Sequence, residues 1–172
     1  MLKGQDILLL LKLCDEPSDW SVRSLADAID LDPAGAHRAL RRLEEARLVD
    51  RSRRRVNRAN AREFLVHALK YEFPPRQGGM SRGLPTAWAA PPLSGILAST
   101  DEPPLVWPDP KGNVRGIALE PLHESAPRVA RKDPAIAEEL ALLDAIRVGG
   151  DARVRGLAAE ELAKRLRAPA PA

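Results

Sequence analysis

Residues 21 to 49 constrain the fold more than any other part of the chain, because two helix-capping signals stand a short distance apart. Ser21 can cap one helix, and Asp32 followed by Pro33 can cap a second. Apolar residues recur at one-turn spacing after each cap. They are Leu25, Ala26 and Ile29 in the first helix, and Ala36, Leu40 and Leu43 in the second. The spacing predicts two short helices joined by a tight turn at Asp30-Leu31.

The same region holds most of the positive charge of the chain. Ten arginines and no lysines fall between His37 and Arg62, against three acidic residues, so this stretch carries +7 while the rest sums to −4. The arginines begin opposite the apolar stripe of the second helix. They continue into a polar segment between Val49 and Val56, which suits a short hairpin with arginines at its tip. Such a localised positive field favours a polyanionic partner, most simply double-stranded DNA.

The pattern SVRSLADAIDLDPAGAHRALRRLEEARLVDRSRRRV resembles the winged helix-turn-helix of MarR-like bacterial transcriptional regulators. The matching positions are Leu25-Ala26, Asp32, Leu40, Leu43, Leu48-Val49 and Arg51 to Arg55. Members usually carry glycine in the turn and before the LV strand, where this chain has Asp30 and Arg47. Because arginine enters the left-handed region less readily than aspartate, we expect a different exit from the second helix. The resemblance covers residues 1–73 and implies a DNA-binding transcriptional regulator.

On this interpretation a recognition helix over residues 33–46 enters the major groove, and an arginine-rich wing over residues 50–56 lies on the DNA backbone. Arginines of the helix can reach phosphates or guanine edges, whereas those of the wing follow phosphates. The predicted DNA-binding residues are Gly35, His37, Arg38, Arg41, Arg42, Arg51, Arg53, Arg54, Arg55 and Arg58. A simpler interpretation of the same charge is a solvated face whose arginines pair with Glu44, Glu45 and Asp50.

Enzymatic motifs are missing from the sequence. It contains no Gly-rich phosphate loop, no GxSxG and no HExxH, and His37, His67 and His123 are far apart. The single cysteine, Cys14, excludes an intramolecular disulfide and leaves no thiol pair for a metal. We therefore expect no enzyme, no catalytic residue, no cofactor and no metal site.

The sequence also argues against a membrane partner and against RNA. The run ILLLLKLC near the start is too short to span a bilayer and no small-residue cleavage site follows it, so we expect a cytoplasmic protein without a membrane partner. RNA is disfavoured because no aromatic residues interleave the arginines to stack on bases.

The chain divides into three parts: a winged helix-turn-helix DNA-binding domain at 1–73, a proline-rich irregular segment packed on it at 74–131, and a C-terminal helical pair at 132–168. In the first part, Asn60 is expected to cap a further helix that runs to about Phe73. Eleven of the sixteen prolines lie between residues 73 and 127, which predicts no long regular element there, although VRGIALEPL can form one strand.

The role of the proline-rich part stays open. It holds too many large apolar residues for a solvated linker, with Trp88 as one anchor. A second nucleic-acid contact, a lid over a ligand or partner site, and a plain surface wrap all fit its composition.

The first helix, expected at residues 4 to 14, is apolar on nearly every face from Ile7 to Leu11. This surplus apolar face, together with the C-terminal helical pair, predicts a homodimer. The sequence thus predicts a mainly α protein with a β-hairpin wing that acts as a dimeric repressor on a partly palindromic operator. The alternative is an antitoxin or other protein-interaction module that binds a protein partner through its middle and C-terminal segments.

Overall fold

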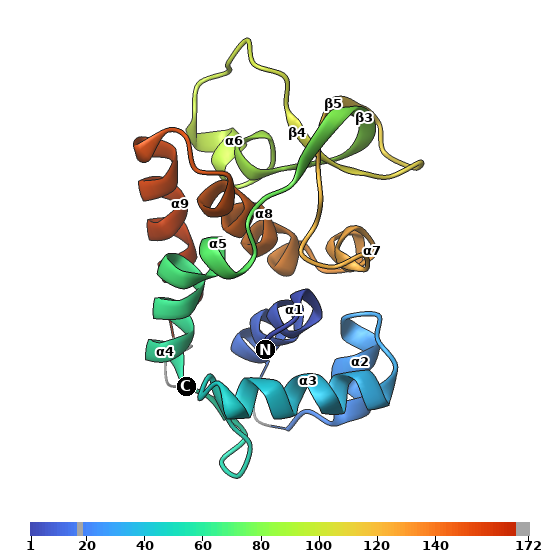
Figure 1. The fold of residues 1–172 in the computed structure, drawn as a ribbon, viewed down its shortest axis with the longest axis vertical. Helices are drawn as coiled ribbons and strands as arrows, with labels where there is room; N and C mark the ends of the chain where they lie inside the picture. The colour runs from blue at the N-terminus through green and yellow to red at the C-terminus, as the bar shows by residue number, and fades with distance from the viewer. Residues whose placement is uncertain (17–18, 168–172) are drawn as a thin grey trace.

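The computed structural model describes residues 1–16 and 19–167, and it confirms the predicted fold class. Figure 1 shows α1, α2 and α3 at one end of the molecule, a small three-stranded sheet at the other, and the C-terminal helices between them. The end of the predicted C-terminal part, residue 168, lies outside the described residues.

The helix-turn-helix forms as its capping signals predict. Helix α2 (Val22–Ala28) begins after Ser21, whose side chain accepts a hydrogen bond from the N–H of Ser24 at 3.0 Å. Helix α3 (Pro33–Glu45) begins after Asp32, which accepts from the N–H of Gly35 at 2.8 Å. The turn between them passes through Asp30 with φ of 56°. Strands β1 (Val49–Asp50) and β2 (Arg55–Val56) then pair antiparallel and form the predicted wing.

The apolar side chains of helix α1 (Gly4–Asp15) are covered by the rest of the chain. The helix packs against α2, α3, β2 and α8, and the side chains from Ile7 to Leu11 are all fully buried. Cys14 is also buried, which raises the pKa of its thiol to about 12. The apolar face of α1 therefore gives no support for a second subunit, because α8 covers this face within one molecule.

The next helical stretch begins three residues earlier than predicted. Asn57, and not Asn60, caps it, because the Asn57 side chain accepts from the N–H of Asn60 at 3.2 Å. The amide of Asn60 instead donates to the carbonyl of Arg47 at 2.9 Å, which ties this helix to the end of α3. The stretch runs as α4 (Arg58–Glu63), a π-helical turn η1 (Phe64–Ala68) and α5 (Leu69–Glu72).

The middle of the chain is more regular than its prolines predicted. Strand β3 (Gln77–Thr86) is ten residues long, and β4 (Leu105–Pro108) and β5 (Val114–Leu119) pair with it and with each other. One part of β3 pairs with β5 and its last residues pair with β4. The sheet accommodates Pro85 as the next-to-last residue of β3 and Pro108 as the last residue of β4. Strand β5 lies in the stretch VRGIALEPL, where one strand was predicted. Between β3 and β4 lie η2 (Ala87–Ala89) and the short α6 (Leu93–Ile96).

Three helices complete the described chain. They are α7 (Ala126–Lys132), α8 (Pro134–Val148) and α9 (Ala152–Arg165). Asp133 and Asp151 cap α8 and α9, and Gly149 and Gly150 take positive φ between the two helices. Helices α8 and α9 pack on each other as the predicted pair. Helix α7 was not predicted.

A buried polar cluster joins α8 to the sheet. Asp144 accepts hydrogen bonds of 2.7 Å from Thr86 Oγ1, Trp107 Nε1 and Arg147 Nη1. Burial raises the pKa of Asp144, while these donors act in the opposite direction. With every partner satisfied, the cluster fixes the orientation of the sheet on α8. Within the described ranges, no helix has both the length and the apolar character that crossing a bilayer requires.

Candidate nucleic-acid interface

Helix α3 has one side in the core and one side in solvent. The buried side consists of Gly35, Ala36, Ala39, Leu40 and Leu43. His37, Arg38 and Arg41 lie on the exposed side. A Cβ atom on Gly35 would come within 2.9 Å of Asp32 Oδ2, so glycine serves the helix cap here. The predicted DNA contact of Gly35 is corrected on this ground, because Gly35 is buried in the first turn.

The wing turn is organised by Asp50. Its carboxylate accepts from Ser52 Oγ at 2.7 Å and from the N–H of Arg53 at 3.1 Å, and these bonds lower the pKa of Asp50. The Arg54 guanidinium lies 4.3 Å from the centre of the Trp20 ring, a cation–π contact. The tip of the hairpin is therefore held against the residues that precede α2.

Three arginines with exposed or partly exposed side chains pair only loosely with the acids of the same region. The pairs Arg41–Glu45, Arg51–Glu44 and Arg53–Asp50 have N–O separations of 3.5, 3.8 and 3.7 Å. Exposed pairs of this length contribute between zero and about 1 kcal/mol each, so a phosphate can replace the carboxylate at small cost. Arg38 and Arg55 are exposed and form no ion pair within residues 1–16 and 19–167. The solvated-face interpretation therefore accounts for only part of the cluster.

We call the outward residues of α3 and of the wing the basic surface. It comprises His37, Arg38, Arg41, Arg51, Arg53, Arg54 and Arg55. Figure 1 shows α3 lying across one end of the molecule, with the turn between β1 and β2 projecting beyond it. His37 Nε2 and Arg51 Nη2 lie 3.5 Å apart, so the helix and the wing form one continuous surface.

Arg47 is an exposed arginine that the predicted set omitted. It connects α3 to the wing with φ of 60°, and the N–H of Leu48 closes the helix by donating to Leu43 at 2.9 Å. We expected the chain to leave α3 differently from family members that carry glycine at this position. That prediction is wrong, because Arg47 adopts the left-handed conformation that glycine would take. The sequence signal for Arg47 is its place among the ten arginines between His37 and Arg62.

Arg42 points away from the basic surface and into the protein. Its Nε donates to Asp6 Oδ2 at 2.7 Å and its Nη2 to Asp6 Oδ1 at 2.6 Å. Asp6 is fully buried, and hydrogen bonding to it raises the pKa of Arg42. The sequence prediction of a DNA contact for Arg42 is therefore corrected, since its guanidinium is already paired inside.

Arg58 is also engaged inside the molecule. Its Nη2 donates to the carbonyl of Cys14 at 2.8 Å, and its Nη1 donates to the carbonyl of Leu166 at 3.0 Å. These bonds connect α4 to the end of α1 and to the end of α9. The predicted DNA contact of Arg58 is corrected for the same reason as that of Arg42.

The histidines do not gather into a site. His37 belongs to the basic surface, His67 is exposed on η1, and His123 Nδ1 lies 2.8 Å from Ser125 Oγ. Burial lowers the pKa of His123. In the part of the chain that the structure describes, no three His, Cys, Asp or Glu side chains form a group that could hold a metal ion.

A capped helix-turn-helix followed by a basic hairpin defines the chain as a protein with a winged helix-turn-helix DNA-binding module. Comparison with protein families agrees: residues 2–53 match the IclR helix-turn-helix domain. The match extends from α1 into the wing and supports a DNA-binding transcriptional regulator. The MarR-like resemblance is not confirmed. Comparisons with curated proteins and with solved structures gave no significant match.

Proposed function

We propose that this chain is a transcriptional repressor that binds duplex DNA through the basic surface. The observation that carries the proposal is the separation of roles on α3. Arg38 and Arg41 face solvent, whereas the adjacent Arg42 is held by the buried Asp6. Repression then follows when the bound protein occupies promoter DNA, and no catalytic step is required.

The basic surface divides by position into two kinds of contact. His37, Arg38 and Arg41 lie on the helix that enters the major groove, where arginine can donate two hydrogen bonds to guanine. The wing arginines contact the phosphate backbone of the DNA and supply affinity that depends little on the DNA sequence. They are Arg51, Arg53, Arg54 and Arg55.

The proposal retains a homodimer on a partly palindromic operator, with the two copies of α3 about 34 Å apart. Helix α1 no longer supports this arrangement, since its own chain covers it. Sedimentation of the free protein and of its DNA complex tests the arrangement separately. Two copies on each operator are expected, and one copy on a single asymmetric site would contradict the dimer without affecting DNA binding.

The experiment that tests the function is selection of genomic duplex fragments by the purified chain, followed by sequencing. We expect enrichment of one common sequence, including DNA upstream of a neighbouring gene. The double variant R38A/R41A should lose that enrichment. R82A/R115A is the matched control, because it removes the same two charges from exposed residues of β3 and β5 at the opposite end of the molecule. Absence of enrichment, or isolation of a stoichiometric protein partner in place of DNA, would contradict the proposal.

A further inference from the structure

A pocket of about 360 Å³ lies between the sheet and the corner where α7 meets α8. One wall of the pocket comes from the sheet and the segment after β3, and it consists of Leu84, Pro85, Ala90, Pro91 and Trp107. The other wall comes from α7 and α8, and it consists of Ala130, Arg131, Pro134, Ala137 and Glu138. Volumes of this size are at the lower end of the range for small-molecule sites, and a cavity of about 150 Å³ already holds benzene. The pocket therefore has room for two fused rings.

The pocket walls are held in place by contacts outside the cavity. The Trp107 indole is fixed by its 2.7 Å hydrogen bond to Asp144. Arg131 Nη1 pairs with Asp109 Oδ2 at 2.6 Å, which ties α7 to the segment that follows β4. Because proline also restricts the backbone at Pro85, Pro91 and Pro134, the cavity is formed before any ligand arrives.

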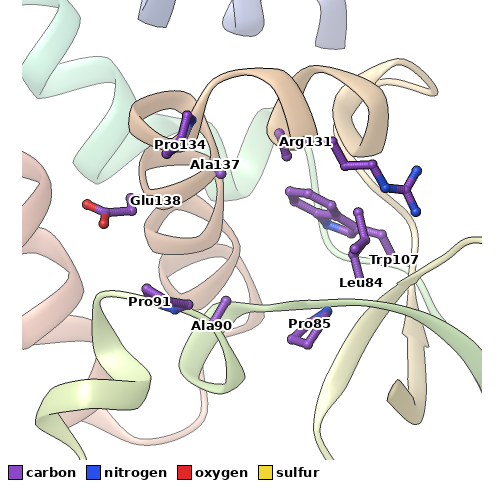
Figure 2. Close-up of a pocket in the computed structure, with 10 residues that line it drawn as sticks. Leu84, Pro85, Ala90, Pro91, Trp107, Arg131, Pro134, Ala137 and Glu138 are labelled. Atoms are coloured by element: carbon purple, nitrogen blue, oxygen red, sulfur yellow. The ribbon is translucent and has the colours of Figure 1, made fainter. Parts of the chain in front are cut away.

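The chemistry of the lining favours a neutral ligand. Figure 2 shows the carboxylate of Glu138 and the guanidinium of Arg131 pointing away from the other lining side chains. Both charges already have partners, since Glu138 pairs with Arg165 at 2.7 Å and Arg131 pairs with Asp109. The remaining lining consists of aliphatic side chains, prolines and the Trp107 ring. An ion would lose its hydration without gaining a free counter-charge.

The pocket is connected to the helix-turn-helix through α7. Ser125, which precedes α7, donates to the carbonyl of Ile29 at 3.1 Å, and Arg128 pairs with Asp30. These contacts hold the turn between α2 and α3. The hydrogen bond from Arg128 lowers the pKa of Asp30. The helix that lines the pocket with Ala130 thus also holds the turn that orients the recognition helix.

We infer that this pocket binds a small neutral aromatic molecule of one or two rings, and that its occupation changes the affinity for DNA through α7. The second half of the inference rests on the proposed function. The first half concerns the pocket alone. By thermodynamic linkage, a ligand that shifts α7 must change DNA affinity by the same factor by which DNA changes ligand affinity.

Indole is the probe that tests the pocket. In protein labelled with ¹⁵N, indole should shift the side-chain N–H resonance of Trp107 in a saturable manner. It should also give intermolecular nuclear Overhauser effects to the methyl groups of Ala130 and Ala137 in the unmodified protein. Indole-3-carboxylate, which has the same rings and a negative charge, should bind at least tenfold more weakly. No saturable shift, contacts located elsewhere, or tighter binding of the carboxylate would overturn the site.

Two variants locate the effect on the protein. A137F fills the cavity and should abolish the saturable shift. A135F adds the same group at an exposed residue of α8 outside the pocket, and it should leave the shift unchanged. Persistence of the shift in folded A137F would overturn the assignment, and the Overhauser contacts decide the question if A137F does not fold.

Coupling to DNA is measured with the same probe. Saturating indole should change the Kd for a selected duplex at least threefold in the unmodified protein. R128A should keep indole binding and lose this change, because it removes the contact with Asp30. An unchanged Kd, or full coupling in R128A, would overturn the coupling. Failure of the protein to bind any duplex would instead refute the proposed function, while indole binding to the pocket would still be measurable.

Discussion

The carboxylate of Asp6 on α1 holds the guanidinium of Arg42 on α3 through two hydrogen bonds of 2.6 and 2.7 Å. Asp6 Oδ2 also accepts the backbone N–H of Lys3 at 2.8 Å, so the carboxylate is fixed at the start of α1. This pair joins two helices and holds the Arg42 side chain on the inner side of α3. Arg38 and Arg41 lie on the exposed side of the same helix.

Replacing Asp6 by alanine should lower the free energy of unfolding by about 3 kcal/mol, because it leaves the largely buried Arg42 without its partner. Urea denaturation measures the change. The double variant D6L/R42M should be less destabilised than the sum of D6L and R42M, since no unpaired charge remains in it. Strict additivity of the two single effects would show that the pair contributes no coupling.

R47G should raise the free energy of unfolding by about 1 kcal/mol. Arg47 has φ of 60°, a conformation that glycine adopts without the steric cost imposed by a Cβ atom. R47A separates backbone from charge, because it removes the guanidinium and keeps the Cβ. If R47A stabilises the protein as much as R47G, charge and not backbone conformation is the cause.

R53A should weaken DNA binding equally on selected and random duplexes. It should reduce the slope of log K against log salt by about 0.9, the value for one phosphate contact on duplex DNA. Arg53 is 79% exposed, and among the described residues its side chain pairs only with Asp50, at 3.7 Å, so the variant should unfold at the same urea concentration as the unmodified protein. Titrations at four salt concentrations provide the slope. An unchanged slope would place the wing away from the DNA backbone.

Glu139 should make stability fall as the pH rises. Its side chain is buried, and Oε2 accepts no hydrogen bond from the described residues. Burial, together with Asp15 and Asp133, raises the pKa of Glu139 to about 9 from an ordinary 4.5. Between these values the folded state holds a proton that the unfolded state releases, so the stability decreases with pH by at most about 1.4 kcal/mol per unit.

E139Q tests this prediction because it keeps the shape of Glu139 and cannot ionise. The difference in unfolding free energy between E139Q and the unmodified protein should grow from pH 5 to pH 9 and level off above. Denaturation at five pH values within that window measures it. A constant difference across the window would mean that Glu139 is ionised in the folded state.

Local signals in the sequence were sufficient for the elements that carry the basic surface. Ser21 and Asp32 cap helices as predicted, because an N-cap hydrogen bond depends on residues only three positions apart. Near the start of α4, the sequence offers two asparagines that could cap the helix. The sequence pattern predicted Asn60, whereas the structure uses Asn57.

Features that depend on distant residues could not be predicted. In the sequence, Arg42 and Arg58 look like the exposed arginines around them. Only their distant partners turn them inward: Asp6 holds Arg42, and the carbonyls of Cys14 and Leu166 hold Arg58. The length of β3 likewise depends on two partner strands from later in the chain. The division at residues 73 and 131 stays a prediction.

The central claim is that duplex DNA binds the outward side of α3, and the direct test compares two exposed arginines, Arg41 on α3 and Arg115 on β5, by fluorescence anisotropy on one labelled, selected duplex. R41A should raise Kd by about 5- to 150-fold, which corresponds to 1–3 kcal/mol. R115A should leave Kd nearly unchanged. Equal Kd values for R41A and the unmodified protein, or no binding of duplex by the unmodified protein at low salt, would contradict the claim.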